Sequence, residues 1–151
     1  MEKHVFFSFI LLMNTLASLP SFAQLRKIPS EVTGALKEKY PYADNVSWKD
    51  KLTAFAASFD IGNQKYEARF NEKGEWKSTE KEIAENDLPE EVKDGFDKSK
   101  YADWEKRNIY LIELPHDVIQ YRIYIAKNDI RKKNLLFNSD GKLLRDNITI
   151  K

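Results

Sequence analysis

The chain has 151 residues, and its 25 lysine and arginine residues nearly balance its 24 aspartate and glutamate residues, leaving a formal net charge of +1. Such a balance creates no single-sign field that would attract nucleic acid or an anionic membrane, so we expect neither as a partner. The absence of cysteine excludes disulfides and a cysteine nucleophile, while an aromatic content of 13% indicates a packed core rather than a disordered chain.

The N-terminus has the pattern of a signal peptide. Lys3 precedes an apolar run, Val5–Met13, and the segment Ser21–Ala23 offers small residues for cleavage before Gln24. The alternative is a membrane anchor, but a spanning helix needs about 20 apolar residues and this run is shorter. The residue after the cut is not cysteine, which excludes a lipoprotein. We therefore predict a signal peptide over residues 1–23 and a periplasmic or secreted mature chain without stable membrane insertion.

The mature chain contains two similar halves. The segment 28–32 (IPSEV) recurs at 88–92 (LPEEV), and the segment 70–74 (FNEKG) recurs at 137–141 (FNSDG). The order of the two matches is the same and their offsets are nearly equal, which favours an internal duplication over chance.

Each half begins with a predicted amphipathic helix. A stripe of apolar side chains recurs every fourth residue, which places the stripe on one helical face. Pro41 ends the first helix. The stripe consists of Ile28, Val32, Leu36 and Tyr40 in the first helix and of Leu88, Val92 and Phe96 in the second.

Each of these helices also contains a glycine, Gly34 in the first and Gly95 in the second. Glycine inside a helix costs about 1 kcal/mol relative to alanine. We therefore expect close packing at both positions.

After each helix the hydrophobic period changes to two, which predicts strands separated by turns of glycine, asparagine, aspartate and proline. In the first half the predicted strands are 55–61, 66–70 and one that begins at Trp76, with turns at 62–63 and 71–74. In the second half they are 109–114, 119–125, 130–137 and 142–150, with turns at 115–117, 128–129 and 138–141.

These elements predict an α+β fold of two tandem units, residues 24–84 and 85–151, with the polar segment 83–87 at their junction. Each unit is a helix followed by an antiparallel meander of about four strands. The helix and one sheet face bury their apolar surfaces against each other, so the opposite sheet face is expected to be exposed. Units of about 60 residues are marginally stable alone, and we therefore expect them to share an interface or one continuous sheet.

The first unit carries a pattern of packing and turn residues that is typical of one family. The pattern comprises Pro29, Val32, Tyr40-Pro41, Val46, Trp48, Tyr66, Phe70-Asn71 and Gly74. It resembles the PepSY-like domain family, whose exported members are often duplicated and whose fold is similar to that of the β-lactamase inhibitory protein. The resemblance spans residues 28–150 and implies a periplasmic or secreted binding or inhibitory protein without catalytic residues. The second unit departs from the pattern, because Lys100-Tyr101-Ala102 replaces Tyr-Pro.

Residues suited to catalysis or metal binding are scarce in the mature chain. His116 is its one histidine, and it falls in a predicted turn rather than beside a nucleophile or other metal ligands. The segment Asn138–Gly141 resembles part of a calcium loop but lacks the further oxygen ligands, so we interpret it as a type I turn. We predict no catalytic residue, no metal site and no cofactor. An enzyme would instead require a deep pocket that converges on His116 and two carboxylates.

Aromatic and arginine side chains are enriched at protein interfaces, and they supply the binding candidates. The alternation within 119–125 directs Tyr121 and Ile123 toward the helix, and directs Arg122 and Tyr124 outward. The alternative for each candidate is a role in packing. The candidate binding residues are Trp48, Trp76, Tyr110, Arg122 and Tyr124.

Two binding hypotheses follow. The first is a non-catalytic exported protein that docks an envelope or secreted protein partner on its exposed sheet face, with inhibition as one form of this role. The second is a small-molecule or peptide carrier that uses a cleft between the two units. An open sheet face bearing aromatic and arginine residues favours the first, and an enclosed apolar pocket favours the second.

Overall fold

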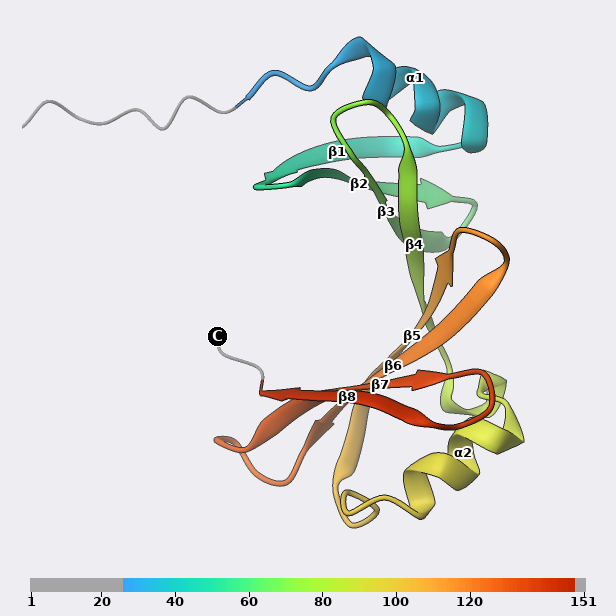
Figure 1. Ribbon diagram of the computed structural model, residues 1–151, viewed down its shortest axis with the longest axis vertical. Coiled ribbons are helices and arrows are strands. Elements are labelled where there is room, and N and C mark those ends of the chain that lie inside the picture. The colour runs from blue at the N-terminus through green and yellow to red at the C-terminus, as the bar shows by residue number, and fades with distance from the viewer. Residues whose placement is uncertain (1–25, 149–151) are drawn as a thin grey trace, which may run out of the picture.

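The structure, a computed structural model, describes residues 26–148 (Figure 1). The predicted signal peptide, residues 1–23, lies outside the described residues. The described range contains two α-helices, one short 3-10 helix and eight strands. In chain order they are α1 (Ser30–Lys39), β1 (Asp44–Lys51), β2 (Ala54–Ile61), β3 (Gln64–Phe70), β4 (Trp76–Ile83), η1 (Glu85–Asp87), α2 (Glu90–Asp97), β5 (Glu105–Leu114), β6 (Val118–Ala126), β7 (Lys132–Asn138) and β8 (Leu143–Ile148).

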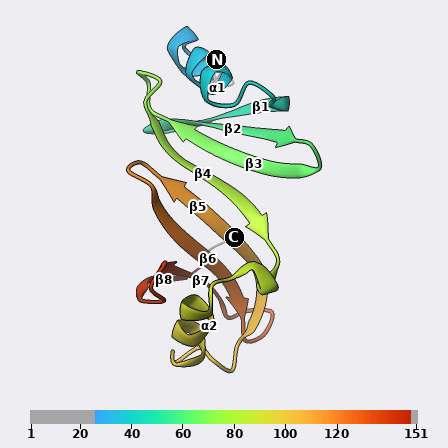
Figure 2. The ribbon, with the colours of Figure 1, turned by 90° about the vertical axis from the view of Figure 1, so that its right-hand side faces the viewer.

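All eight strands form one antiparallel sheet, in the order in which they occur in the chain. The strand β4 pairs with β5 from Thr79 opposite Glu113 to Ile83 opposite Ile109. The two predicted meanders therefore join in one continuous sheet, which is one of the two arrangements that the sequence allowed. The sheet curves into an arc, with α1 and α2 on its outer side near opposite ends (Figures 1 and 2).

Each helix buries its predicted stripe against its own half of the sheet. In the first half α1 contributes Val32 and Leu36, and in the second half α2 contributes Val92 and Phe96. The first core further contains Phe55, Ala57, Phe59, Ala68 and Phe70, and the second further contains Leu88, Tyr101, Ile109, Tyr121, Ile123, Ile125, Leu135 and Phe137.

The turns β3–β4 and β7–β8 have the same local geometry, and both contact a helix. The side-chain oxygen of Asn71 accepts hydrogen bonds from the backbone of Lys73 and Glu75, and that of Asn138 accepts one from the backbone of Lys142. Gly74 and Gly141 follow with φ of 79° and 77°, a conformation in which only glycine avoids a steric penalty. The predicted turns at 71–74 and 138–141 are confirmed.

The second helix approaches its turn more closely than the first. A Cβ atom added to Gly95 would lie 1.9 Å from the carbonyl oxygen of Gly141, and one added to Gly141 would lie 1.8 Å from the carbonyl oxygen of Glu91. In the first half, where Ala35 stands at the position that matches Gly95, a Cβ atom added to Gly74 would lie 2.6 Å from the carbonyl oxygen of Glu31 and 3.4 Å from the Ala35 methyl group. The missing side chain at Gly95 thus allows backbone contact between α2 and the β7–β8 turn.

Gly34 does not have the close packing that its sequence predicts. An added Cβ atom there would meet nothing within 4 Å, because the residue lies on the exposed face of α1. The prediction is therefore wrong for Gly34 and confirmed for Gly95.

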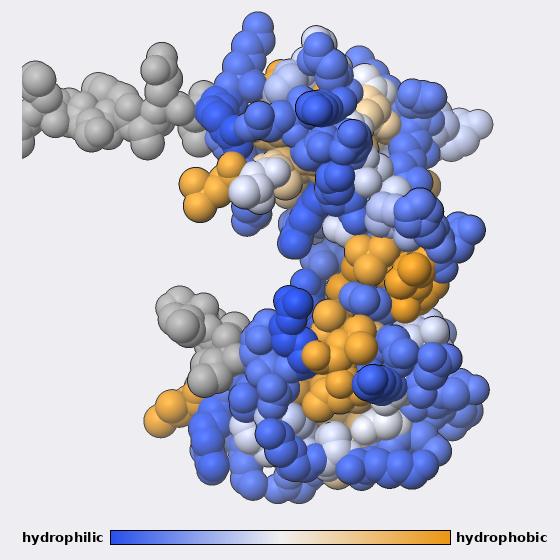
Figure 3. Space-filling model, in the orientation of Figure 1, coloured by the Kyte–Doolittle hydropathy of each residue, from blue (hydrophilic) through white to orange (hydrophobic). Residues whose placement is uncertain are grey.

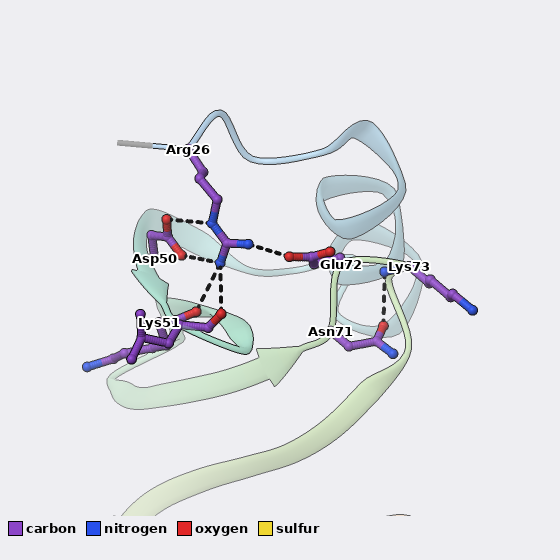
Figure 4. Close-up of polar contacts among 7 residues, drawn as sticks. Arg26, Asp50, Lys51, Asn71, Glu72 and Lys73 are labelled. Carbon is purple, nitrogen blue, oxygen red and sulfur yellow. Dashed lines mark hydrogen bonds and ion pairs between the residues drawn. The ribbon is translucent and has the colours of Figure 1, made fainter. Parts of the chain in front are cut away.

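Arg26, just before α1, ties the start of the described chain to two turns (Figure 4). Its guanidinium donates to both carboxylate oxygens of Asp50, at 2.9 and 2.6 Å, and to Glu72. It also donates to the carbonyl oxygens of Lys51 and Leu52. The same guanidinium, mainly through these hydrogen bonds, holds the pKa of Asp50 below its ordinary value. The segment that leads into α1 is thereby held against the β1–β2 and β3–β4 turns.

The two helical glycines make a matched test of this packing. Gly95→Ala is expected to lower the free energy of unfolding by about 1–3 kcal/mol, because the new methyl group would overlap the Gly141 carbonyl. Gly34→Ala is expected to raise it by up to about 1 kcal/mol, because alanine is the better helix former and the site is open. Urea unfolding followed by circular dichroism measures both, and equal effects of the two substitutions would contradict the close approach at Gly95.

Candidate functional site

The face of the sheet opposite the two helices is the candidate site, and we call it the concave face. Because side chains alternate along each strand, the residues between the core residues point onto this face. A hollow of about 520 Å³ lies there and spans both halves of the sheet. Figure 3 shows this side of the molecule, with hydrophobic surface between the two ends of the arc over β5 to β7. The hollow is lined by Arg69, Ser78, Glu80, Ile112, Leu114, Gln120, Arg122, Asn134, Leu136, Arg145 and Asn147.

Arg122 of β6 lines the hollow, and its side chain is held from two sides. Its Nη2 atom donates to Oε1 of Glu80 at 2.9 Å, and its guanidinium carbon lies 4.6 Å from the ring centroid of Tyr110. All three side chains are partly buried. Since Glu80 is on β4 and Arg122 is on β6, this pair bridges β5 at the junction of the two halves. A half-buried arginine held in this way has already lost much of the rotamer freedom that binding would otherwise restrict.

The electrostatic environment of Tyr110 reflects the same cluster. Burial raises the pKa of its hydroxyl above the ordinary tyrosine value, and the negative charge of Glu82 raises it further. The positive charge of Arg122 acts in the opposite direction. Tyr110 therefore remains neutral at physiological pH and presents a hydroxyl group at the edge of an aromatic surface.

Tyr124 lies on the concave face, in the cross-strand row next to Arg122. It stands opposite Asn108 of β5 and opposite Asn134 of β7, and it is partly buried. The outward orientation predicted for Arg122 and Tyr124 is confirmed, since Tyr121 and Ile123 are buried in the second core. The structure thus brings together three of the five binding candidates: Tyr110, Arg122 and Tyr124.

Trp48 and Trp76 lie on the other side of the sheet, facing α1. Their cross-strand partners are Ala57 and Phe70, which belong to the first core, and the pairing fixes both indoles on that side. Trp76 donates its Nε1 hydrogen to Oγ1 of Thr79 at 2.8 Å, on the side of the sheet that faces the helices. The structure does not bring either tryptophan to the concave face.

Trp48 instead lines a separate groove of about 660 Å³ between α1 and β1. The groove includes Leu36 and Tyr40 of the first helix region and the half-exposed Val46 of β1. It lies within the first half of the sheet and does not reach the concave face.

Several lining residues of the hollow were not among the candidates from the sequence. Ile112 and Leu114 occur in a strand that is apolar on both faces, so alternation alone does not assign them a side. Arg145 requires the register of β8, where it stands opposite Leu136. Alternation in β4 does give a usable signal for Glu80. Thr79 is buried on the helix-facing side of the sheet, so its neighbour Glu80 points to the other side.

The described residues contain no metal-binding cluster, and His116 lies away from the hollow. No group of three or more histidine, aspartate or glutamate side chains within residues 26–148 is arranged to hold a metal ion. His116 is exposed in the β5–β6 turn, with a φ of 64°, and it does not line the hollow. Both helices of the described range are too short and too polar to cross a bilayer.

Comparison with known proteins identifies relatives in sequence and in fold. A sequence model of a family described as beta-lactamase-inhibitor-like and PepSY-like matches residues 53–145. No match is found among proteins of curated function.

Three solved structures from Bacteroides species share the fold. A BLIP-like protein from Bacteroides fragilis is 24% identical, with a TM-score of 0.72, and the match covers 85% of this chain and 91% of that chain. A DUF2874 family protein from Bacteroides ovatus is 25% identical, with a TM-score of 0.73 and coverage of 82% and 89%. A protein described as periplasmic, from Bacteroides eggerthii, is 24% identical, with a TM-score of 0.74 and coverage of 82% and 90%. These likenesses establish a mixed fold of helices and an antiparallel sheet.

The titration of Tyr110 tests the arrangement of the central cluster. Arg122→Gln is expected to raise the pKa of Tyr110 further, and Glu82→Gln is expected to lower it. The folded-state pKa lies above the unfolded-state pKa, so the stability linked to Tyr110 is present below the unfolded-state pKa and is lost as pH rises through the folded-state pKa. Ultraviolet titration of tyrosinate formation measures the pKa, with Tyr110→Phe to identify the signal. An unchanged Tyr110 pKa in Arg122→Gln would show that the guanidinium does not act on this hydroxyl.

Proposed function

We propose that this chain, which belongs to the beta-lactamase-inhibitor-like, PepSY-like family, binds a protein partner on the concave face of its sheet and catalyses no reaction. The observation that carries the proposal is the hollow that spans both halves, in which Arg122 is held by Glu80 and Tyr110 beside partly buried aliphatic side chains. Interfaces concentrate their binding energy in such arginine and aromatic side chains within well-packed surroundings.

The shape of the surface supports a protein partner over a small ligand. The hollow is open along the arc rather than enclosed, as Figure 3 shows, and its walls come from six strands. Small-molecule sites usually bury most of the ligand surface in a closed, largely apolar cavity. The open hollow therefore favours the docking hypothesis over a carrier with a cleft between the two halves.

The likeness to a BLIP-like protein of Bacteroides fragilis supports an inhibitory form of this role. In that form the partner is an envelope or secreted enzyme, and the concave face covers the surface through which its substrate enters. Fold alone does not fix function, so the partner has to be identified by experiment.

We further propose that the chain works in the periplasm or outside the cell. The signal-peptide pattern of residues 1–23 supports export, and so does the Bacteroides eggerthii relative that is described as periplasmic. No lipid anchor is proposed, because Gln24 rather than cysteine follows the expected cleavage site.

We also propose a duplicated origin, with units at 24–84 and 85–151, and the matching elements of the two halves support it. Each half supplies one helix, four strands, one core and one asparagine-glycine turn that contacts its helix. In this proposal the two units were joined edge to edge, and the hollow arose at their junction.

The proposal is tested by isolating the partner from the native envelope. The tagged chain is crosslinked in its own cells, and the proteins that co-purify are compared among the unmodified chain and two tyrosine variants. Tyr124→Ala removes a ring from the concave face, and Tyr42→Ala removes an 80% exposed ring from the α1–β1 connection on the other side of the sheet. We expect one stoichiometric protein that is reduced at least about tenfold by Tyr124→Ala and retained by Tyr42→Ala, in line with the loss of an interface hot spot.

Two outcomes would contradict docking on the concave face. A third variant, Ile112→Lys, places a charge in the lining of the hollow, and a partner that is retained by both this variant and Tyr124→Ala would bind elsewhere on the chain. A partner lost only in Tyr42→Ala would place the interface beside α1.

A further inference from the structure

The carboxylates in the middle of the concave face already have hydrogen-bonding partners. Each lies on β3 or β4 and accepts a hydrogen bond from a side chain on its own or another strand. Since these charges are satisfied internally, they leave little unpaired negative charge for a basic partner to neutralise. The pairs are Arg69 with Glu67 at 2.9 Å, Arg122 with Glu80 at 2.9 Å and Asn108 with Glu82 at 2.8 Å.

Arg145 on β8 has no such partner. Its exposed side chain lines the hollow and makes no hydrogen bond or ion pair with another residue in the range 26–148. The acidic residue next to it, Asp146, is held on the opposite side of the sheet by Tyr101 and Lys100. The lining of the hollow therefore contains three arginines but only one carboxylate, Glu80, and that carboxylate is paired.

Arg122 and Arg145 stand on either side of Leu136. The register places Arg122 opposite Leu136 and Leu136 opposite Arg145. Neighbouring strands are about 4.8 Å apart, so the two arginine backbones are about 10 Å apart with one aliphatic side chain between them. A guanidinium carries five N–H donors, and Arg122 directs one of them to Glu80. Donors from both arginines are thus available above Leu136.

From this arrangement we propose that the hollow recognises an acidic segment of the protein partner. A carboxylate of that segment accepts hydrogen bonds from Arg122 and Arg145 above Leu136, and an adjacent apolar side chain packs on Ile112 and Leu114. The inference rests on the proposed function, since it names the chemistry of the partner that the concave face binds. Charge-assisted bonds from arginine to carboxylate are the strong members of their class, and the aliphatic surroundings strengthen them by excluding water.

A nucleic acid fits the same surface poorly. A phosphodiester chain that followed the hollow past Arg122 would next meet Glu80 and Glu82 on β4. A single carboxylate between two arginines avoids that repulsion, which is why the charge pattern selects a protein segment with local rather than continuous negative charge.

The test is a nuclear magnetic resonance titration of the exported chain, Gln24 to Lys151, with two capped tetrapeptides. One has the sequence phenylalanine-aspartate-leucine-glycine, and its twin has asparagine in place of aspartate. The readouts are the side-chain N–H signals of the arginines and the methyl signals of Ile112 and Leu136. We expect the acidic peptide to shift these signals and to bind about tenfold more tightly than its twin, as for a hydrogen-bonded charge pair.

Variants locate the effect. Arg145→Gln is expected to remove most of the preference for the acidic peptide, whereas the matched control Arg107→Gln is expected to leave it unchanged. Arg107 is exposed, pairs with Glu105 and does not line the hollow. Both variants are checked for folding by their amide spectra, so that a loss of preference is not a loss of structure.

The inference would be overturned if the two peptides bound equally, if neither bound, or if the preference for the acidic peptide survived Arg145→Gln. A thymidine oligonucleotide is titrated as well, and tighter binding of it than of the acidic peptide would also overturn the inference. Equal binding with shifts confined to Ile112 and Leu136 would leave docking on the concave face in place while removing its acidic preference. The crosslinking experiment with Tyr124→Ala separately tests whether a partner binds the concave face at all.

Discussion

The pairing of β4 with β5 is the contact that makes one surface out of two halves. The chain leaves the sheet after Ile83, forms η1 and α2, and returns to the neighbouring position as β5. Without this pairing, two four-stranded sheets would each have an additional exposed edge, which is a liability for aggregation. With it, residues of both halves line one hollow, and the ion pair from Arg122 to Glu80 adds a side-chain link across the junction.

The same continuity determines how the surface can respond to a partner. The concave face consists of strand residues whose neighbours on the other side of the sheet are packed in two cores. Side chains on such a frame are ordered before binding, so less conformational entropy is lost on association than for a surface made of loops. The backbone contact between Gly95 and Gly141 fixes α2 on the second half in the same way, and Arg26 fixes the approach to α1 on the first.

The elements that sequence predicts well are those with a strong local pattern. The helical stripes and the asparagine-glycine turns depend on residues close together in the chain, and the structure has them where they are expected. The strand β1 gives little signal, because its residues are exposed almost throughout. Gly34 and Gly95 look alike in sequence, yet only Gly95 meets another backbone, since that contact depends on a turn more than forty residues away.

The candidate site is less predictable for the same reason. Arg122 and Tyr124 can be assigned to the outer face because the strand 118–126 alternates clearly, whereas Tyr110 is a candidate through its residue type alone. Trp48 and Trp76 lie near register shifts, at which alternation gives no reliable side. Arg145 and Leu136 become neighbours only through the register of β7 with β8. Residue type thus predicts that the chain has a protein-binding surface. Which residues lie on that surface depends on the register between the paired strands.

The sequential strand order has a consequence for how the chain reaches this state. Every strand in residues 26–148 pairs with the strand that precedes or follows it in sequence, so no pairing there skips a strand. Six of the seven pairings close only a short turn, which costs little entropy, whereas the pairing of β4 with β5 closes over η1 and α2. The chain, which has no cysteine to form disulfides, can therefore build each half of this sheet one hairpin at a time, and the pairing of β4 with β5 then joins the two halves.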